Sequence, residues 1–97
     1  MRVIARKTLK AYGERVPDAA PALNAWYHEA RRARWKSPAD IKEKYGSASI
    51  LKGGRVVFNI GGNKYRLVVW INFKVSIVYI RFVGTHKEYD KINAQEV

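Results

Sequence analysis

The side chains best suited to chemistry lie in one stretch, Arg81 to Ile92, where an apolar run ends in a group of titratable residues. Ser76 to Val83 is rich in β-branched and aromatic residues, which predicts a strand, and Gly84 predicts a sharp turn after it. Groups mounted just past the end of a rigid strand commonly perform catalysis or recognition. The group here consists of His86, Lys87, Tyr89 and Asp90.

The chemistry open to these residues is cleavage of RNA without a metal. It requires a group that accepts the 2′-OH proton, a group that protonates the leaving 5′-oxygen, and fixed positive charge for the transition state. Imidazole titrates near neutral pH, so His86 could be acid or base. Arg66 and Arg81 could bind phosphate oxygens in a fork. The supporting roles fall to Lys87 and Tyr89, which could orient or stabilise, and to Asp90, which could hold the imidazole.

Each of these residues also has a purely structural interpretation. Arg66 and Arg81 could be ordinary solvated strand residues, and a lone histidine such as His86 could simply end a strand. Tyr89 and Ile92 are three residues apart and could pack a terminal helical turn onto the sheet. The catalytic interpretation therefore depends on whether the arginines and the histidine converge.

Length and charge restrict the class of protein. A chain of 97 residues fits one domain, residues 1–97, with a thin core. The net charge is +11, and the excess is spread over both halves: Met1–Gly46 has 11 basic and 5 acidic residues, and Ser47–Val97 has 8 and 3. A folded surface this basic indicates a polyanionic partner, nucleic acid or an acidic protein, ahead of an anionic membrane.

Residues that bind metals are scarce. The chain has no cysteine and two isolated histidines, and of its eight acidic residues only Glu88 and Asp90 are close in sequence. These two could simply offset nearby lysines, so we expect neither a metal nor another cofactor. The N-terminus lacks an apolar signal core and no apolar run approaches membrane-spanning length, so we expect a cytoplasmic protein without a membrane partner.

The first half of the chain has helical spacing after a short strand at Arg2–Ile4. The first helix starts at Ala5 and is stopped by Pro17. Asp18 is the expected N-cap of a second helix, and Ser37 caps a third that runs to about Tyr45. Trp35, between these helices, could be a core residue or a partner contact.

After Gly46 the apolar period changes from helical to alternating, which predicts a sheet. The fold class is therefore α+β, a small and mainly antiparallel sheet with the N-terminal helices packed on one face. The expected strands are Ser47–Leu51, Arg55–Ile60, Lys64–Phe73 and Ser76–Val83.

The strand register follows from placing apolar residues together. A hairpin tip at Gly62-Asn63 sets Phe58 opposite Leu67 and Asn59 opposite Arg66. A second tip at Lys74-Val75 would set Phe82 opposite Leu67 on the core side. On the reverse side it would set Arg81 opposite Val68 and Tyr79 opposite Trp70.

This register predicts an open sheet face with arginines and aromatic walls, suited to phosphates and unstacked bases. Its RNA-contacting residues would be Asn59, Lys64, Trp70, Tyr79 and Asp90, beside the catalytic candidates Arg66, Arg81, His86, Lys87 and Tyr89.

Two segments resemble a known family. Val57–Val68, with its Asn-Ile-Gly-Gly-Asn motif, and Tyr79–Ile92, with Thr-His-Lys-Glu-Tyr-Asp, are similar to the HigB-type toxins of the RelE-like superfamily. The likeness extends over nearly the whole chain, including the basic helices and the Ser-Pro start of the third helix.

The resemblance implies a metal-independent endoribonuclease that cuts messenger RNA in the ribosomal decoding site. It also implies a cognate antitoxin, HigA-like, with a helix-turn-helix domain. Carried over by position, the functional residues would be Arg66, Arg81, His86, Lys87 and Tyr89, with Asn59 and Lys64 as RNA contacts.

Two other functions fit the same basic surface. One is a non-catalytic module that binds RNA or the ribosome. The other is an inactive partner of the antitoxin that serves only in repressor assembly.

Overall fold

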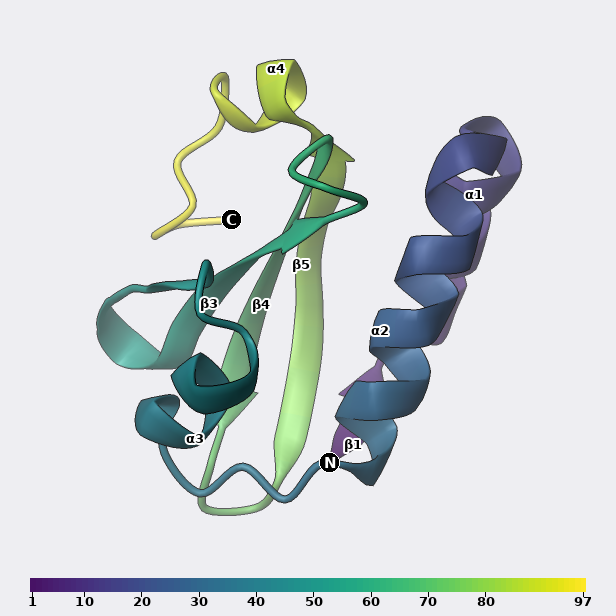
Figure 1. Cartoon of the computed structure of the whole chain (residues 1–97). Coiled ribbons are helices and arrows are strands. Elements are labelled where there is room, and N and C mark those ends of the chain that lie inside the picture. Colours follow the sequence, from purple (N-terminus) through teal and green to yellow (C-terminus); the bar gives the residue numbers. More distant parts are fainter.

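The computed structural model describes all 97 residues as a five-stranded sheet with helices on one face (Figure 1). The strand order is β1-β5-β4-β3-β2, and every neighbouring pair is antiparallel except β1 with β5. The predicted α+β class with a mainly antiparallel sheet is confirmed. In chain order the elements are β1 (Arg2–Ile4), α1 (Arg6–Arg15), the 3-10 turn η1 (Pro17–Ala19), α2 (Ala20–Arg32), α3 (Pro38–Lys44), β2 (Ser49–Ile50), η2 (Lys52–Gly54), β3 (Arg55–Ile60), β4 (Tyr65–Asn72), β5 (Ile77–Thr85) and α4 (His86–Tyr89).

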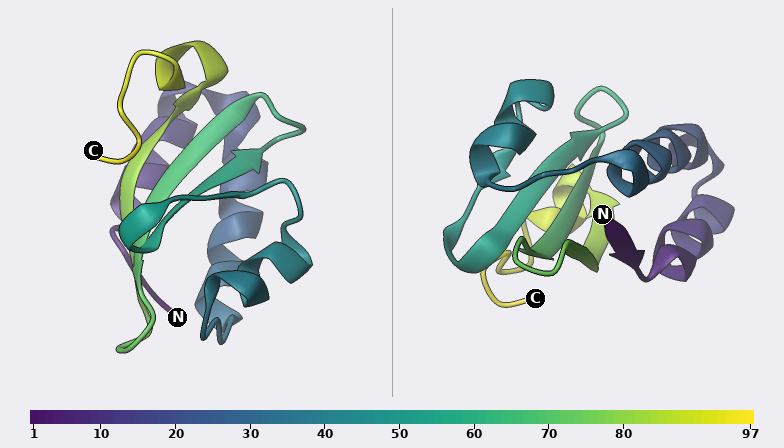
Figure 2. Two further views of the ribbon diagram at one scale, coloured as in Figure 1. Left: turned by 90° about the vertical axis from the view of Figure 1, so that its left-hand side faces the viewer. Right: turned by 90° about the horizontal axis from the view of Figure 1, so that it is seen from below.

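The main core lies between the sheet and the helices. α1 and α2 lie side by side along one face of the sheet (Figures 1 and 2). Phe58 of β3 is fully buried and makes aromatic contacts with Trp26 of α2, with Trp35, and with Tyr45 after α3. Trp35 is therefore a core residue, which answers the question that the sequence left open. No helix of the chain is both long and apolar enough to cross a membrane.

Two of the predicted helix starts differ in detail. Asp18 does not cap α2: it lies in η1, and Ala19 is the N-cap of α2 without a side-chain hydrogen bond. Pro17, whose fixed φ suits a helical first turn, starts a 3-10 turn that joins α1 to α2 directly. Ser37 does occupy the N-cap position of α3, but its side chain makes no capping bond. Asp40 Oδ2 instead accepts a hydrogen bond from the main-chain N–H of Lys36, at 2.8 Å.

The predicted register is confirmed in the first hairpin and fails part-way along the second. β3 and β4 pair as expected, with Phe58 opposite Leu67 and Asn59 opposite Arg66. Counted from the second hairpin turn, β4 and β5 keep the expected pairs as far as Val69 with Ile80. A β-bulge follows, so that Val68 pairs with Phe82 and not with Arg81. Arg81 is thus the extra residue of the bulge.

Because a one-residue shift moves each following side chain to the other face, Phe82 points away from the main core, contrary to the prediction. It packs against a second apolar cluster centred on Val57, Val68 and Ala94. The segment after α4 runs back over this face, opposite α1 and α2 (Figure 1). The expected open face is therefore covered in its middle, by Tyr89, Ile92, Ala94 and Val97.

Gly84 lies within β5 and does not make the predicted turn. The strand continues to Thr85, and Gly84 is buried. A Cβ at this position would lie 2.7 Å from Cζ of Phe82 and 3.1 Å from Cβ of Glu88. A larger residue here would have to displace the Phe82 ring or the Glu88 side chain, so the position of glycine reflects a close approach of side chains and not a turn.

Candidate active site

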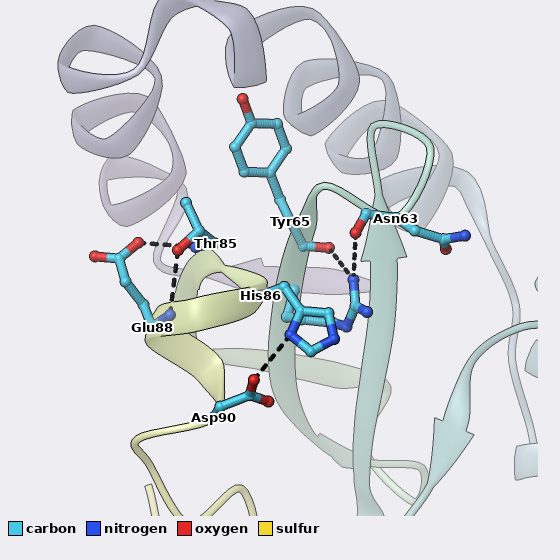
Figure 3. Close-up of polar contacts among 7 residues, drawn as sticks. Asn63, Tyr65, Thr85, His86, Glu88 and Asp90 are labelled. Atoms are coloured by element: carbon cyan, nitrogen blue, oxygen red, sulfur yellow. Dashed lines mark hydrogen bonds and ion pairs between the residues drawn. The ribbon is translucent and has the colours of Figure 1, made fainter.

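The single turn of α4 is held by a capping box at its start. Thr85 is the N-cap: its Oγ1 accepts a hydrogen bond from the N–H of Glu88 at 3.1 Å, and Glu88 Oε1 accepts one from the N–H of Thr85 at 2.8 Å. Figure 3 shows these two residues facing each other at the helix start. The bond from the Thr85 N–H is the main reason that the pKa of Glu88 is lowered. The box fixes the helix that carries His86, Lys87 and Tyr89.

Glu88 also joins α4 to α1. Its Oε1 accepts a hydrogen bond from the hydroxyl of Tyr12, at 3.3 Å. Burial, followed by the negative charge of Glu88, raises the pKa of Tyr12. From the sequence, Glu88 was expected only to offset nearby charge, although Thr-x-x-Glu before a helix is the pattern of a capping box and could have revealed this role.

His86 and Asp90 lie one helical turn apart and contact each other. Nδ1 of His86 is 3.0 Å from Oδ2 of Asp90, and both side chains are exposed (Figure 3). The main-chain N–H of His86 donates to the carbonyl of Lys64, at 3.3 Å, which fixes α4 to the first hairpin. With a proton on Nδ1 shared with Asp90, Nε2 is the atom free to exchange a proton with a substrate. Asp90 therefore has the geometry predicted for it.

Arg66 lies at the same end of the sheet as His86. It pairs with Gly84 across β4 and β5, and the next pair, Tyr65 with Thr85, leads directly into α4. Nη1 of Arg66 donates to the main-chain oxygens of Asn63 at 2.8 Å and Tyr65 at 3.3 Å. These bonds orient the half-buried guanidinium at the hairpin end and leave its other N–H groups available for phosphate.

Arg81 does not join this pair. Its Nε donates to the main-chain oxygen of Val97 at 3.1 Å, and that oxygen also accepts from Nη1 of Arg55 at 2.5 Å. Along β5, Arg81 is three residues from Gly84, or about 10 Å at the rise of a strand. The second apolar cluster, which contains Phe82, lies between. The predicted convergence of both arginines on the imidazole is wrong, and the catalytic role given to Arg81 loses its geometric basis.

The remaining predicted residues fall at different places on the same face. Tyr79 stacks on Trp70, with centroids 4.9 Å apart and an angle of 23°, as the register required. Asn59 donates from Nδ2 to the oxygen of Ser47 at 3.0 Å. Tyr89 is half-buried against the second apolar cluster, which is the packing role considered for it. Lys64 and Lys87 are both exposed. Lys87 follows His86 in sequence, and the main-chain oxygen of Lys64 accepts from the N–H of His86 at 3.3 Å.

Residues 19–92 match the model of the HigB_toxin family, described as the RelE-like toxic component of a toxin–antitoxin system. The chain belongs to the HigB family of RelE-like toxins. As a family member it has an antitoxin as its partner. The resemblance drawn from the two sequence segments is confirmed.

Curated relatives of this HigB-family chain are similar over almost its whole length. The mRNA interferase toxin HigB of Escherichia coli strain K12 is 35% identical over 96 residues, which cover 97% of this chain and 92% of the relative. The mRNA interferase HigB of Escherichia coli O157:H7 has the same identity and coverage. That of Escherichia coli O6:H1 is 23% identical over 94 residues, which cover 95% and 91%. In this chain no three His, Asp or Glu side chains are grouped so that they could hold a metal ion.

Proposed function

We propose that this toxin is an endoribonuclease that cuts messenger RNA without a metal while the message is bound to the ribosome. The observation that carries the proposal is that Arg66 and His86 lie at the same end of the sheet, on a protein of net charge +11. The relatives named mRNA interferases support it. Cleavage inhibits translation because the message is destroyed during reading.

The proposed reaction is attack by the 2′-oxygen on the neighbouring phosphorus. The new P–O bond forms as the bond to the 5′-oxygen breaks, while the 2′-OH gives up its proton and the 5′-oxygen takes one up. The products are a 2′,3′-cyclic phosphate and a 5′-hydroxyl. His86 acts through Nε2 as the leading acid–base group, and Arg66 binds the phosphate oxygens as negative charge develops. Asp90 orients the imidazole, and Lys87 supplies further positive charge beside it. Tyr89 would contribute to the site from the edge of the second apolar cluster.

RNA binding is proposed to extend over the same sheet face. The contacts would be Asn59 and Lys64 near the first hairpin, Asp90 beside His86, and the stacked rings of Trp70 and Tyr79 farther along. Aromatic rings bind unstacked bases without regard to sequence, and the basic surface attracts the backbone.

The partners proposed for the chain are messenger RNA, the ribosome and an antitoxin that is HigA-like and carries a helix-turn-helix domain. With these partners the toxin would act in the cytoplasm as a single domain, residues 1–97. No small-molecule cofactor enters the proposed reaction.

The test is to incubate the purified toxin with translating ribosomes and to map the ends of the message and their chemistry. New 5′-hydroxyl ends opposite 2′,3′-cyclic phosphates are expected, with few or none when the same RNA is free. Ribosomes that stall without new ends would contradict the proposal and favour a non-catalytic binding module. A toxin that neither cuts nor stalls would instead be an inactive partner of its antitoxin.

A further inference from the structure

We infer that the groove between α1 and α2 is a docking site for the antitoxin, and that its occupant is an amphipathic helix with acidic side chains along one edge. The inference rests on the family membership, which gives the chain an antitoxin, and not on the proposed cleavage of RNA. None of the residues that line this groove belongs to the proposed cutting site or to the proposed RNA contacts. Binding of the antitoxin and cutting of the message are therefore separable by substitution.

The groove follows from the way in which the two helices face each other. The short turn η1 joins α1 to α2, so the helices lie side by side on the face of the sheet that the C-terminal segment does not cover (Figure 1). The volume between them is about 390 Å³. Residues one helical turn apart line it from both sides: Arg6, Lys10 and Glu14 on α1, and Ala20, Asn24 and Tyr27 on α2.

The floor of the groove is apolar. Leu9 and Leu23 belong to the main core and are 4% and 2% exposed, so they close the groove from the sheet side. Ala20 is half-buried and Pro21 is exposed on the α2 wall. The helices approach closely at Gly13, where an added Cβ would lie 3.0 Å from Cβ of Ala20. An apolar hollow of this kind fits the apolar side of another helix.

The edge of the groove on α1 is positively charged. Arg6 and Lys10 are exposed, and neither takes part in an ion pair. Glu14, one turn farther on, is the acidic side chain of the groove. The docked helix should therefore carry acidic side chains opposite Arg6 and Lys10 and none opposite Glu14. From Arg6 to Glu14 the groove is about 12 Å long, which matches about two turns of a helix.

The groove is better suited to a protein than to RNA. Its aromatic ring, that of Tyr27, has the guanidinium carbon of Arg6 over one face, 4.5 Å from the centroid, and His28 meets it edge-on. The ring therefore holds Arg6 at the edge of the groove. The aliphatic side chains of the floor offer nothing on which a base would stack.

A second copy of this chain is a poor occupant of the groove. In a symmetric dimer one patch meets itself, so Arg6 and Lys10 would approach their own copies. Two chains of net charge +11 also repel each other. The antitoxin is the protein partner that the family membership supplies, and an acidic helix edge carries the charges that the groove lacks.

The first experiment fills the groove and measures binding of the purified antitoxin component of the same toxin–antitoxin system by fluorescence anisotropy. Asn24→Trp places a large side chain in the groove and should raise the Kd at least about tenfold. Ala25→Trp is the matched control, because Ala25 is the next residue of α2, is exposed and does not line the groove. It should change the Kd less than about twofold.

The second experiment reverses one charge at the edge. Lys10→Glu should raise the Kd for the antitoxin about tenfold by repelling the acidic edge, and more at low salt than at high salt. Lys7→Glu makes the same change at an exposed position of α1 that does not line the groove, and its Kd should stay within about threefold of the wild type.

Growth gives a second readout of the same variants. At a level of antitoxin that neutralises the wild-type toxin, Asn24→Trp and Lys10→Glu should arrest growth, whereas Ala25→Trp and Lys7→Glu should not. Without antitoxin all four should be as toxic as the wild type. Because the Kd is measured without RNA, a toxin that cuts no message refutes the proposed function, and the Kd still decides the docking site.

The inference is overturned if Asn24→Trp and Lys10→Glu bind the antitoxin as their controls do. It is also overturned if they bind the antitoxin normally but lose binding to ribosomes, or if they turn a dimer of the toxin into a monomer. These results would assign the groove to the ribosome or to a second copy. Thermal melting shows whether the variants fold, and Lys10→Glu, at an exposed position, decides the matter if Asn24→Trp does not fold.

Discussion

Removing the cap of α4 should loosen the helix that carries the imidazole. Thr85→Val keeps the shape of the side chain but removes the oxygen that accepts from the N–H of Glu88. Loss of a threonine N-cap costs about 1 kcal/mol. Since 1.36 kcal/mol corresponds to a factor of ten, the open population of α4 should rise about fivefold. In so short a helix no other turn compensates for the loss.

The assay is hydrogen exchange followed by NMR at the N–H of Asp90, which donates to the oxygen of His86 at 3.0 Å. Exchange should be about fivefold faster in Thr85→Val if α4 opens locally. Thr8→Val is the matched control, because Thr8 is exposed on α1. Equal exchange rates in the two variants would refute the claim that the capping box holds α4.

The capping box also predicts the direction of an acid effect. The pKa of Glu88 is lowered in the folded protein, chiefly by the hydrogen bond from the Thr85 N–H. The Glu88 carboxylate therefore stabilises the folded protein fully at pH values above the ordinary glutamate pKa of 4.5, and this stabilisation is lost as the pH falls below that value. Faster exchange at the N–H of Asp90 is expected in that acidic range for the wild type. Glu88→Gln should lack this pH dependence.

Two further substitutions test the packing around the site. Gly84→Ala should lower the free energy of unfolding by about 1–3 kcal/mol in urea titrations, because the new Cβ would lie 2.7 Å from Cζ of Phe82. A change below about 0.5 kcal/mol would show that the Phe82 ring does not pack against position 84. Tyr12→Phe should cost about 1 kcal/mol by losing the bond to Glu88. Because the pKa of Tyr12 is raised, the wild type should also lose stability as the pH rises above 10, and an identical alkaline loss in Tyr12→Phe would assign it to other groups.

The first hairpin could be predicted from the sequence because its turn residues leave little choice. Gly61, Gly62 and Asn63 all adopt positive φ, between 62° and 73°, which few other residues tolerate. With that turn fixed, the alternation of apolar residues in β3 and β4 allows only one register that buries them together.

The bulge at Arg81 could not be predicted, since the residues after it are apolar on both sides of the strand. Without the bulge Phe82 would face the helices, and with it Val83 does so while Phe82 packs beneath Ala94. Both arrangements satisfy the apolar pattern, so the sequence alone does not distinguish them. The bulge sets Arg81 one residue farther from Arg66 than the predicted register does, and the side chain of Arg81 is bonded to Val97 instead.

The covering of the sheet by the last residues also escaped prediction. Ile92, Ala94 and Val97 are too few and too widely spaced to give a periodic signal. They are nonetheless sufficient to pack on Val57 and Val68 and to divide the face into two ends. The residues of this face could thus be named as candidates from the sequence, whereas the division of the face by the last residues could not.

The central claim is that Arg66 and His86 together cut the RNA, and the most direct test is the single-turnover cleavage rate of message on translating ribosomes. His86→Ala and Arg66→Ala should each slow cleavage at least about a hundredfold, by loss of proton transfer or of transition-state charge. Arg31→Ala should cleave at the wild-type rate. If folded His86→Ala and Arg66→Ala both cut within about threefold of the wild type, the cutting site lies elsewhere and the account is wrong.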